Sequence, residues 1–230
     1  MLPQNSNNIF IIVPVYNEKK EVLEQTIIEL LKMPYRIVIV DDASAGGIFL
    51  PKDTNIYLLR HAVNLGQGAT LQSGIEFALG KGSEYLVTFD ADGQHAATDI
   101  PAMLAPLQNN EADITLASRF LKPGHHNASW SKKILLKTGR WINYFFTGLY
   151  LSDAHNGLRA LTRQAAEKVA LKENRMAHAT EILFAIKKSN LKYREIPATV
   201  TYTEYSKSKG QSVFNSIRIF FDLILHKLFE

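Results

Sequence analysis

The chain has 230 residues, of which 46% are hydrophobic, 21% charged and 10% aromatic. A chain of this length fits one domain with a sizeable core. Its composition excludes a disordered chain, a collagen-like repeat and a coiled coil. The absence of cysteine excludes disulfide bridges, thiolate zinc sites and a cysteine nucleophile.

The net charge of +4 is distributed unevenly along the chain. Residues 1–113 include 7 basic and 14 acidic residues, whereas residues 114–230 include 19 basic and 8 acidic residues. The basic half predicts an anionic partner, such as phosphate groups, nucleic acid or an anionic membrane surface, and a solvated cationic face is the alternative. No secretory signal is visible at the N-terminus, and no apolar run reaches the ~20 residues that span a bilayer. We therefore expect a cytoplasmic protein.

The first half alternates short apolar runs with segments of helical periodicity. Near-continuous apolar runs predict buried strands at 9–15, 36–40, 56–59, 85–89 and 114–117. Apolar residues at helical spacing predict helices between them, at 18–33, 68–79 and 100–107. This alternation predicts the α/β class, with a mostly parallel sheet flanked by helices.

The second half is less regular. A polar loop at 122–129 precedes a basic, aromatic segment that predicts a helix at 130–147. A strand at 157–161, a helix at 177–188 and a strand at 193–202 follow, and a polar loop at 206–211 leads to a last helix at 211–229. No linker separates two domains, so we expect one domain over residues 1–210 and a C-terminal amphipathic helix over 211–230.

Carboxylates follow two of the predicted strands. Asp41 and Asp42 follow the second strand, and Asp90, Asp92 and Gln94 follow the fourth. Ligands bind beyond the carboxyl ends of strands in such sheets, and alternate positions on an extended segment point the same way. Oxygen ligands favour Mg²⁺ or Mn²⁺ holding phosphate groups. A solvated turn is the alternative.

A glycine-rich segment, Asn64-Leu65-Gly66-Gln67-Gly68-Ala69, enters a predicted helix. Glycine allows the backbone to approach a ligand closely, and a helix N-terminus favours anions. Asn64 and Gly68 are therefore candidates for a phosphate contact. A helix-capping turn explains the segment equally well.

Four segments in this order resemble the motifs of glycosyltransferase family 2. They are Val-Pro-Val-Tyr-Asn-Glu at 13–18, Val-Asp-Asp-Ala-Ser at 40–44, the glycine-rich segment at 64–69, and Phe-Asp-Ala-Asp-Gly-Gln at 89–94. The chain is most similar to the dolichyl- or polyprenyl-phosphate sugar synthases of that family. The resemblance continues through Asp-Ala-His-Asn-Gly-Leu-Arg at 153–159 and weakly into the loop at 207–212.

The resemblance implies a Rossmann-like, nucleotide-sugar-binding fold of the A type and inverting transfer, with residues 1–210 as the catalytic domain. By position, the nucleoside would contact Pro14, Tyr16, Glu18 and Asp42, with Asp41 beside it. Asp90 would approach the ribose and the metal, Asp92 and Gln94 would bind the metal on the diphosphate, and Arg119 would contact phosphate.

The acceptor side is less specific. Asp153 is the candidate general base for an alcohol acceptor, but a polyprenyl phosphate is already an anion and needs none. A structural turn held by an Asp–Arg pair is the alternative for residues 153–159. Lys207 and Lys209 stand where the lipid-phosphate synthases usually have a basic motif that begins with arginine, and phosphate binding by both is expected.

The segment 211–229 has a wide apolar face and a narrow polar stripe. It lies in a membrane interface, contacts a partner or second copy, or completes the core. Lysines and aromatic residues at 130–147 favour an anionic lipid surface over nucleic acid. We therefore predict a metal-dependent, inverting glycosyltransferase, peripheral at the inner face of the membrane, that moves a sugar from a nucleoside-diphosphate sugar to polyprenyl phosphate. The alternatives are a lipid-linked or other saccharide acceptor, and a non-catalytic nucleotide-sugar-binding subunit.

Overall fold

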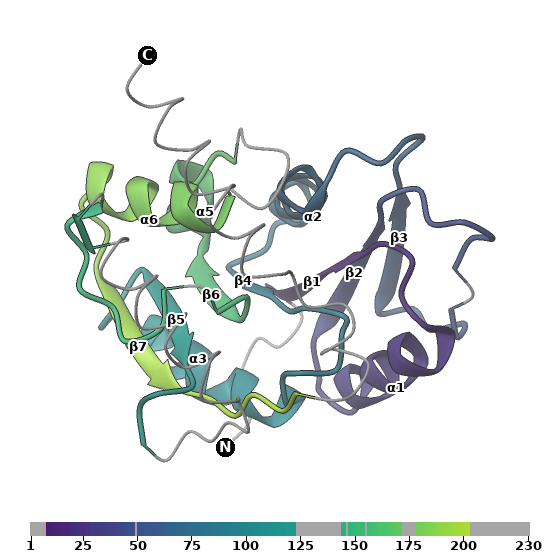
Figure 1. Cartoon of the computed structure of the whole chain (residues 1–230), viewed down its shortest axis with the longest axis horizontal. Coiled ribbons are helices and arrows are strands. Elements are labelled where there is room, and N and C mark those ends of the chain that lie inside the picture. Colours follow the sequence, from purple (N-terminus) through teal and green to yellow (C-terminus); the bar gives the residue numbers. More distant parts are fainter. Residues whose placement is uncertain are drawn as a thin grey trace.

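The computed structural model describes residues 8–48, 50–122, 144–145, 147–154, 156–171 and 178–202. Within them, seven strands form one sheet in the order β3-β2-β1-β4-β6-β5-β7 (Figure 1). The strands are β1 (Ile9–Val15), β2 (Arg36–Asp41), β3 (Ile56–Arg60), β4 (Tyr85–Thr88), β5 (Ile114–Ser118), β6 (Arg159–Thr162) and β7 (Tyr193–Pro197). All neighbouring strands pair in parallel except β6, which is antiparallel to both β4 and β5. The predicted α/β fold with a mostly parallel sheet is confirmed.

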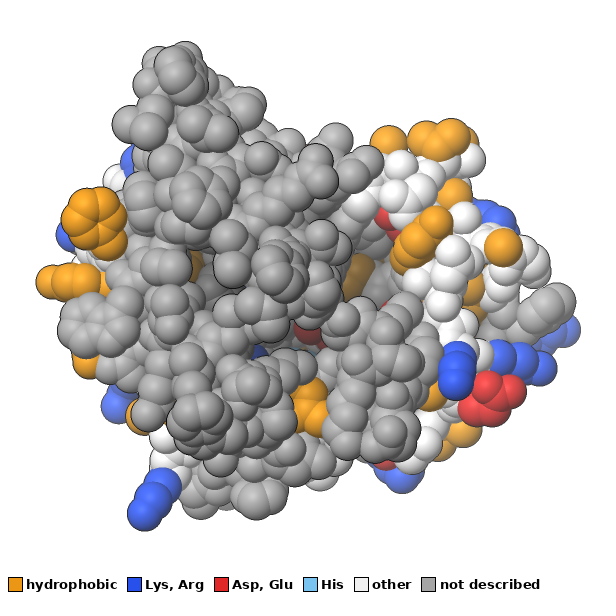
Figure 2. Space-filling model, in the orientation of Figure 1, with side chains coloured by type: hydrophobic (Ala, Val, Ile, Leu, Met, Phe, Trp, Pro, Cys, Tyr) orange, Lys and Arg blue, Asp and Glu red, His pale blue; other side chains and the backbone are white. Residues whose placement is uncertain are grey.

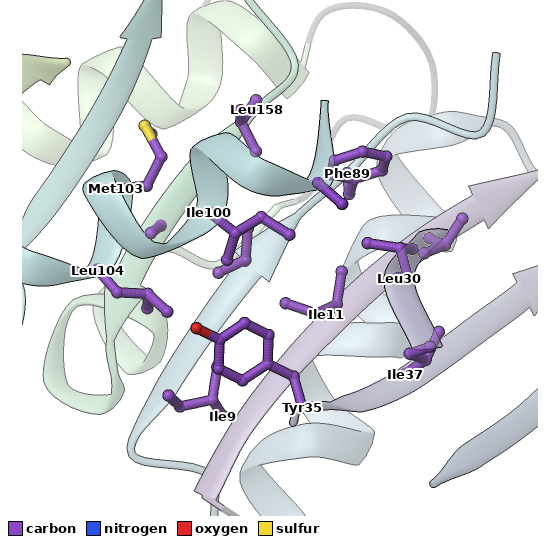
Figure 3. Packing of buried hydrophobic residues seen from close by; sticks show 14 of the residues in the cluster. Ile9, Ile11, Leu30, Tyr35, Ile37, Phe89, Ile100, Met103, Leu104 and Leu158 are labelled. Carbon is purple, nitrogen blue, oxygen red and sulfur yellow. The ribbon is translucent and has the colours of Figure 1, made fainter. Parts of the chain in front are cut away.

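Helices cover both faces of the sheet (Figure 1). They are α1 (Lys20–Leu31), α2 (Gln67–Gly80), α3 (Ile100–Gln108), α5 (Arg163–Lys168) and α6 (His178–Lys188), with a short 3₁₀ helix, η2 (Ala97–Asp99). One apolar core lies between the sheet and helices α1 and α3, and the other lies between the sheet and α2, α5 and α6. Figure 3 shows Ile100 and Leu104 of α3 on the side of Ile9 and Ile11 of β1.

Helix α2 packs closely against the sheet because it contains Gly74. A Cβ atom at this position would lie 2.4 Å from Cγ2 of Ile12 and 3.2 Å from Cγ2 of Val40. The glycine therefore lets the helix axis approach strands β1 and β2. This approach fixes the N-terminus of α2 next to the carboxyl ends of those strands.

Three differences from the predicted elements concern the second half of the chain. The strand predicted at 157–161 is β6, which begins at Arg159. The strand predicted at 193–202 ends at Pro197, and only a single bridge between His95 and Val200 continues the pairing. Helix α5 was not predicted, because six residues are too few to establish a helical period.

Several predictions fall on residues outside the described ranges. These are the helix at 211–229, the domain boundary at 210, the phosphate-binding residues Lys207 and Lys209, and most of the helix at 130–147. Of that helix, Tyr144, Phe145 and Thr147 are described, and all three are helical. Within the described ranges, no helix combines the length and apolarity that crossing a bilayer requires.

Candidate active site

The candidate site lies at the carboxyl ends of β1, β2 and β4, where the sequence analysis placed it. Figure 2 shows acidic side-chain atoms near the middle of the face seen there. Tyr16 is exposed at the end of β1, whereas Pro14 is buried within the strand. On the α2 side, Asn64 is exposed and Gly68 is buried in the first turn of the helix. The structure thus brings the predicted donor-side segments to one edge of the sheet.

Asp42 anchors the segment that leads into α2. Its Oδ1 accepts hydrogen bonds from the backbone N–H of Leu65 (2.9 Å), and its Oδ2 accepts one from that of Gly66 (2.7 Å). Nδ1 of His61 lies 2.8 Å from Oδ1 of Asp42, and Nε2 of His61 lies 2.9 Å from Oγ of Ser73. Burial alone would raise the pKa of Asp42, but these hydrogen bonds and the charge of His61 bring the pKa below its ordinary value.

The sequence analysis gave His61 no role, because nothing in the local sequence connects it to Asp42. The two residues meet because β2 and β3 are parallel neighbours and both end at the same edge. Since protein donors already bond both Asp42 oxygens, its predicted contact with the nucleoside stays a prediction.

Asp41, the last residue of β2, anchors a second turn. Its Oδ1 accepts a hydrogen bond from the N–H of Ser44 (2.9 Å), while Oδ2 is buried 3.5 Å from Nε of Arg60. Oγ of Ser44 in turn accepts a hydrogen bond from the N–H of Asn17 (2.9 Å). Asn17 and Ala43 both have positive φ angles, 49° and 61°, which non-glycine residues adopt rarely. The turns after β1 and β2 are therefore held to each other.

Asp90, two residues after β4, interacts electrostatically with Asp92 of its own turn and with charged groups from two other segments. Its Oδ1 accepts a hydrogen bond from Nε2 of Gln67, at the N-terminus of α2 (3.0 Å). Burial and then the negative charge of Asp92 raise the pKa of Asp90 to about 7; Arg159 opposes this rise and Glu18 adds to it. The predicted residues Glu18, Asp90 and Asp92 are thus electrostatic neighbours. Gln67 lies within the predicted glycine-rich segment, but its contact with Asp90 was not expected.

Arg159 was given only a structural role by the sequence analysis, in the alternative Asp–Arg pair of residues 153–159. It is buried on β6, with 2% of its surface exposed. Burial lowers the pKa of its guanidinium to about 10, while Asp90 and Asp153 oppose that shift. Arg159 therefore supplies positive charge that acts on both carboxylates. The antiparallel insertion of β6 beside β4 puts it there, because Arg159 pairs with Thr88.

Asp92 and Gln94 are bonded to each other. Oδ1 of Asp92 accepts the Gln94 backbone N–H (3.0 Å), and Oδ2 accepts a hydrogen bond from Nε2 of the Gln94 side chain. The carbonyl of Gln94 accepts the N–H of Thr201 (2.9 Å), which holds this turn against the segment after β7. In the part of the chain that the structure describes, no three acidic or histidine side chains are grouped closely enough to hold a metal ion by themselves.

Arg119 and Asp153 form a buried ion pair beyond β5. Oδ2 of Asp153 accepts from Nε (2.5 Å) and from the backbone N–H (3.1 Å) of Arg119, and Nη1 of Arg119 donates to the hydroxyl of Tyr202. Nδ2 of Asn156 donates to the same Asp153 oxygen (3.3 Å). Asp153, at the start of the turn at 153–159, thus forms its ion pair with Arg119, which lies outside that turn. Buried His95 lies nearby, and burial and the charge of Arg119 lower its pKa to about 4.

The model of glycosyl transferase family 2 matches residues 10–170, which include every one of these site segments up to β6. The chain belongs to glycosyltransferase family 2. It is therefore a glycosyltransferase.

Individual relatives cover nearly the whole chain. The UDP-N-acetylglucosamine–dolichyl-phosphate N-acetylglucosaminyltransferase of Methanococcus voltae is 30% identical, over 96% of this chain and 96% of its own. The polyprenol monophosphomannose synthase of Mycolicibacterium smegmatis is 26% identical, and the match covers 88% of this chain and 82% of that protein. A crystal structure of glucosyl-3-phosphoglycerate synthase from Mycobacterium tuberculosis, solved with Mn²⁺, UDP and glucosyl-3-phosphoglycerate, matches with a TM-score of 0.67. It shares 12% sequence identity and covers 95% of this chain and 77% of that one. At this identity the likeness establishes the A-type glycosyltransferase fold.

Proposed function

We propose that this glycosyltransferase moves a sugar from a nucleoside-diphosphate sugar to polyprenyl phosphate, with inversion at the anomeric carbon and with a divalent cation. The observation that carries the proposal is the place of Asp90 at the sheet edge, where Gln67 at the N-terminus of α2 bonds it and where Asp92 and Glu18 add their negative charges. The names of two relatives, one acting on dolichyl phosphate and one making a polyprenol monophosphomannose, support the choice of acceptor.

The donor nucleotide occupies the edge formed by β1, β2 and α2 in this proposal. Tyr16, Glu18 and the end of β1 at Pro14 face the nucleoside, with Asp41 and Asp42 holding the surrounding turns. Asn64 and the first turn of α2 at Gly68 lie on the phosphate side, where the N-terminus of a helix favours negative charge.

The donor set fits a hard divalent cation. Burial and the charges of Asp92 and Glu18 make the ionised form of Asp90 costly, as its raised pKa of about 7 shows, and a cation would offset that cost. Asp90, Asp92 and Gln94 would hold Mg²⁺ or Mn²⁺ through oxygen atoms, which both ions prefer. When bound, the cation neutralises charge on the departing nucleoside diphosphate. The Mn²⁺ in the similar crystal structure supports this assignment.

The acceptor side uses the Arg119–Asp153 pair. A phosphate oxygen of the acceptor forms a bond to the anomeric carbon, and the bond from that carbon to the diphosphate oxygen breaks on the opposite face. No proton has to be removed from an acceptor phosphate anion. Because Oδ2 of Asp153 already accepts three hydrogen bonds, we assign Asp153 to holding Arg119, which contacts a phosphate. Lys207 and Lys209 contribute further positive charge to phosphate binding.

In the same proposal the enzyme works at the cytoplasmic face of a membrane, with the 130–147 and 211–229 segments as its lipid-facing or subunit-facing parts. Their basic, aromatic and apolar composition supports this placement. Residues 1–210 form the catalytic domain in this division of the chain.

The experiment is an acceptor-dependence assay. Purified protein receives a panel of nucleotide sugars, Mg²⁺ or Mn²⁺ and short-chain polyprenyl phosphate, and nucleoside-diphosphate release is followed. We expect release that depends on both cation and acceptor, that is lost in Asp92→Ala and that is kept in Asp53→Asn, which changes an exposed aspartate before β3. Release only with a saccharide acceptor would replace the acceptor assignment. Donor binding with no transfer to any acceptor would favour a non-catalytic binding subunit.

A further inference from the structure

In the part of the chain that the structure describes, the backbone N–H groups of Ser152 and Asp153 donate their hydrogen bonds to one side chain. That side chain is the carboxylate of Glu195 on strand β7. Its Oε1 and Oε2 lie 2.8 Å and 2.9 Å from the N–H nitrogen of Ser152. Oε1 also accepts from Oγ of Ser152 (2.7 Å) and from the N–H of Asp153 (3.1 Å). One carboxylate thus holds two consecutive residues of the turn that ends at Asp153.

The fold explains why this carboxylate reaches the turn. Glu195 is paired in register with Leu116 of β5, so both side chains lie on the same face of the sheet. Leu116, Leu149 and Leu151 belong to one apolar core, so the segment that leads to Ser152 crosses that face. Within this apolar surrounding, a partly buried carboxylate is stable only with donors, and the turn supplies them.

The turn is held from β5 as well. Oγ of Ser152 lies 2.6 Å from Oγ of the fully buried Ser118, the last residue of β5. Arg119 follows Ser118 directly and meets the Asp153 carboxylate at 2.5 Å. Arg119 and Asp153, the two members of the ion pair, therefore each follow a serine. These two serines, Ser118 and Ser152, are hydrogen-bonded to each other.

We propose that Glu195 is a positioning residue of the transfer reaction: by fixing the 152–153 backbone, it sets where Asp153 meets Arg119, and hence where Arg119 presents its charge to the acceptor phosphate. This rests on the acceptor role of Arg119 and Asp153 proposed above. Glu195 does not contact substrate and acts through the ion pair. Removing its carboxylate leaves two partly buried backbone N–H groups without their acceptor, and the turn shifts to recover partners.

The neighbouring residue supplies a matched control. Arg194 lies on the same strand, is 53% exposed, and forms an ion pair with Glu111 at the surface. Arg194→Ala therefore disturbs β7 at the adjacent position without touching the turn at Ser152. Glu195→Gln is the conservative variant, because its amide oxygen can still accept from the Asp153 N–H and Ser152 Oγ.

The test compares Glu195→Ala, Glu195→Gln and Arg194→Ala with the unchanged enzyme. For Glu195→Ala we expect kcat with polyprenyl phosphate to fall about 10- to 100-fold, the range for losing hydrogen bonds to a charged group. Affinity for the nucleoside diphosphate should be unchanged, because the donor residues lie at the ends of β1, β2 and β4 and at the start of α2. Glu195→Gln should recover most of the loss, and Arg194→Ala should match the unchanged enzyme.

A second readout does not depend on turnover. Amide hydrogen exchange at Ser152 and Asp153 should be faster in Glu195→Ala than in Arg194→Ala, with exchange in β1 and β4 unchanged. Equal kcat in Glu195→Ala and Arg194→Ala, or a loss of donor affinity as large as the loss of kcat, would overturn the inference. If the unchanged enzyme shows no acceptor-dependent release, the proposed function fails. In that case the proposed role of Glu195 in transfer fails too. The exchange rates still decide whether Glu195 holds the turn.

Discussion

The carboxylate of Asp90 occupies the space that a side chain at Gly157 would fill. A Cβ atom on Gly157 would lie 1.9 Å from Oδ2 and 2.8 Å from Cγ of Asp90. Gly157 is held in place because its carbonyl accepts a hydrogen bond from Oγ1 of Thr88 (2.7 Å), two residues before Asp90. The absence of a side chain at 157 therefore allows the candidate metal-binding carboxylate to take its position.

Gly157→Ala should displace Asp90 and remove most of the activity. A misplacement of about 1 Å at a reacting site costs about 100-fold in rate, and crowding of this kind destabilises a fold by about 1–3 kcal/mol. Nucleoside-diphosphate release and urea unfolding measure the two effects. Gly80→Ala is the control, since beyond its chain neighbours and the backbone of its own helix no atom lies within 4 Å of its added methyl group. Wild-type turnover in Gly157→Ala would contradict the role given to Asp90.

Asp42→Asn should destabilise the protein in a pH-dependent way. The pKa of Asp42 is lowered in the folded protein by bonds from Leu65, His61 and Gly66, which outweigh its burial. The stabilisation is therefore present above the unfolded pKa of about 3.9 and is lost as pH falls through the lower folded pKa. Urea unfolding at pH 7 should show a deficit of about 1–3 kcal/mol. The deficit should shrink at about pH 3, and a deficit of equal size at both pH values would contradict this account.

Arg119→Met should be strongly destabilising, because it leaves the Asp153 carboxylate buried without its cation. Breaking a buried pair on one side costs about 3–5 kcal/mol. The double variant Arg119→Met with Asp153→Asn removes the unpaired charge, so it should recover part of that stability while its transfer activity stays lost. Denaturant unfolding and the release assay separate the two effects. Equal stability of the single and double variants would argue against the ion pair as the stabilising contact.

Gly74→Ala should lower stability although alanine favours helices. The added methyl group would lie 2.4 Å from Cγ2 of Ile12, and overpacking costs about 1–3 kcal/mol. Helix propensity returns only about 1 kcal/mol. In the same helix, Gly80→Ala gains propensity without the clash, so the two variants should shift the unfolding midpoint in opposite directions. A midpoint raised in both would show that α2 can move away from the sheet.

The acidic positions of the site were predictable, but their partners were not. Asp42 and Asp90 could be predicted because each follows an apolar run that predicts a strand. The carboxyl ends of parallel strands lie at the same edge of the sheet. Gly66, 24 residues from Asp42, and Gln67, 23 residues from Asp90, became partners only through the packing of α2. No periodicity in a sequence encodes contacts at such separations.

The sequence by itself determined the α/β class, the first five strands and the segments that carry the chemistry. It could do so because a strand buried on both faces needs a continuous apolar run, and such runs are visible locally. Only the tertiary structure decided that β6 enters antiparallel between β4 and β5, bringing Arg159 next to Asp90. It likewise decided that Glu195, 42 residues from Asp153, holds that residue's backbone. Strand order and turn contacts depend on which surfaces pack together, and that is a property of the whole chain.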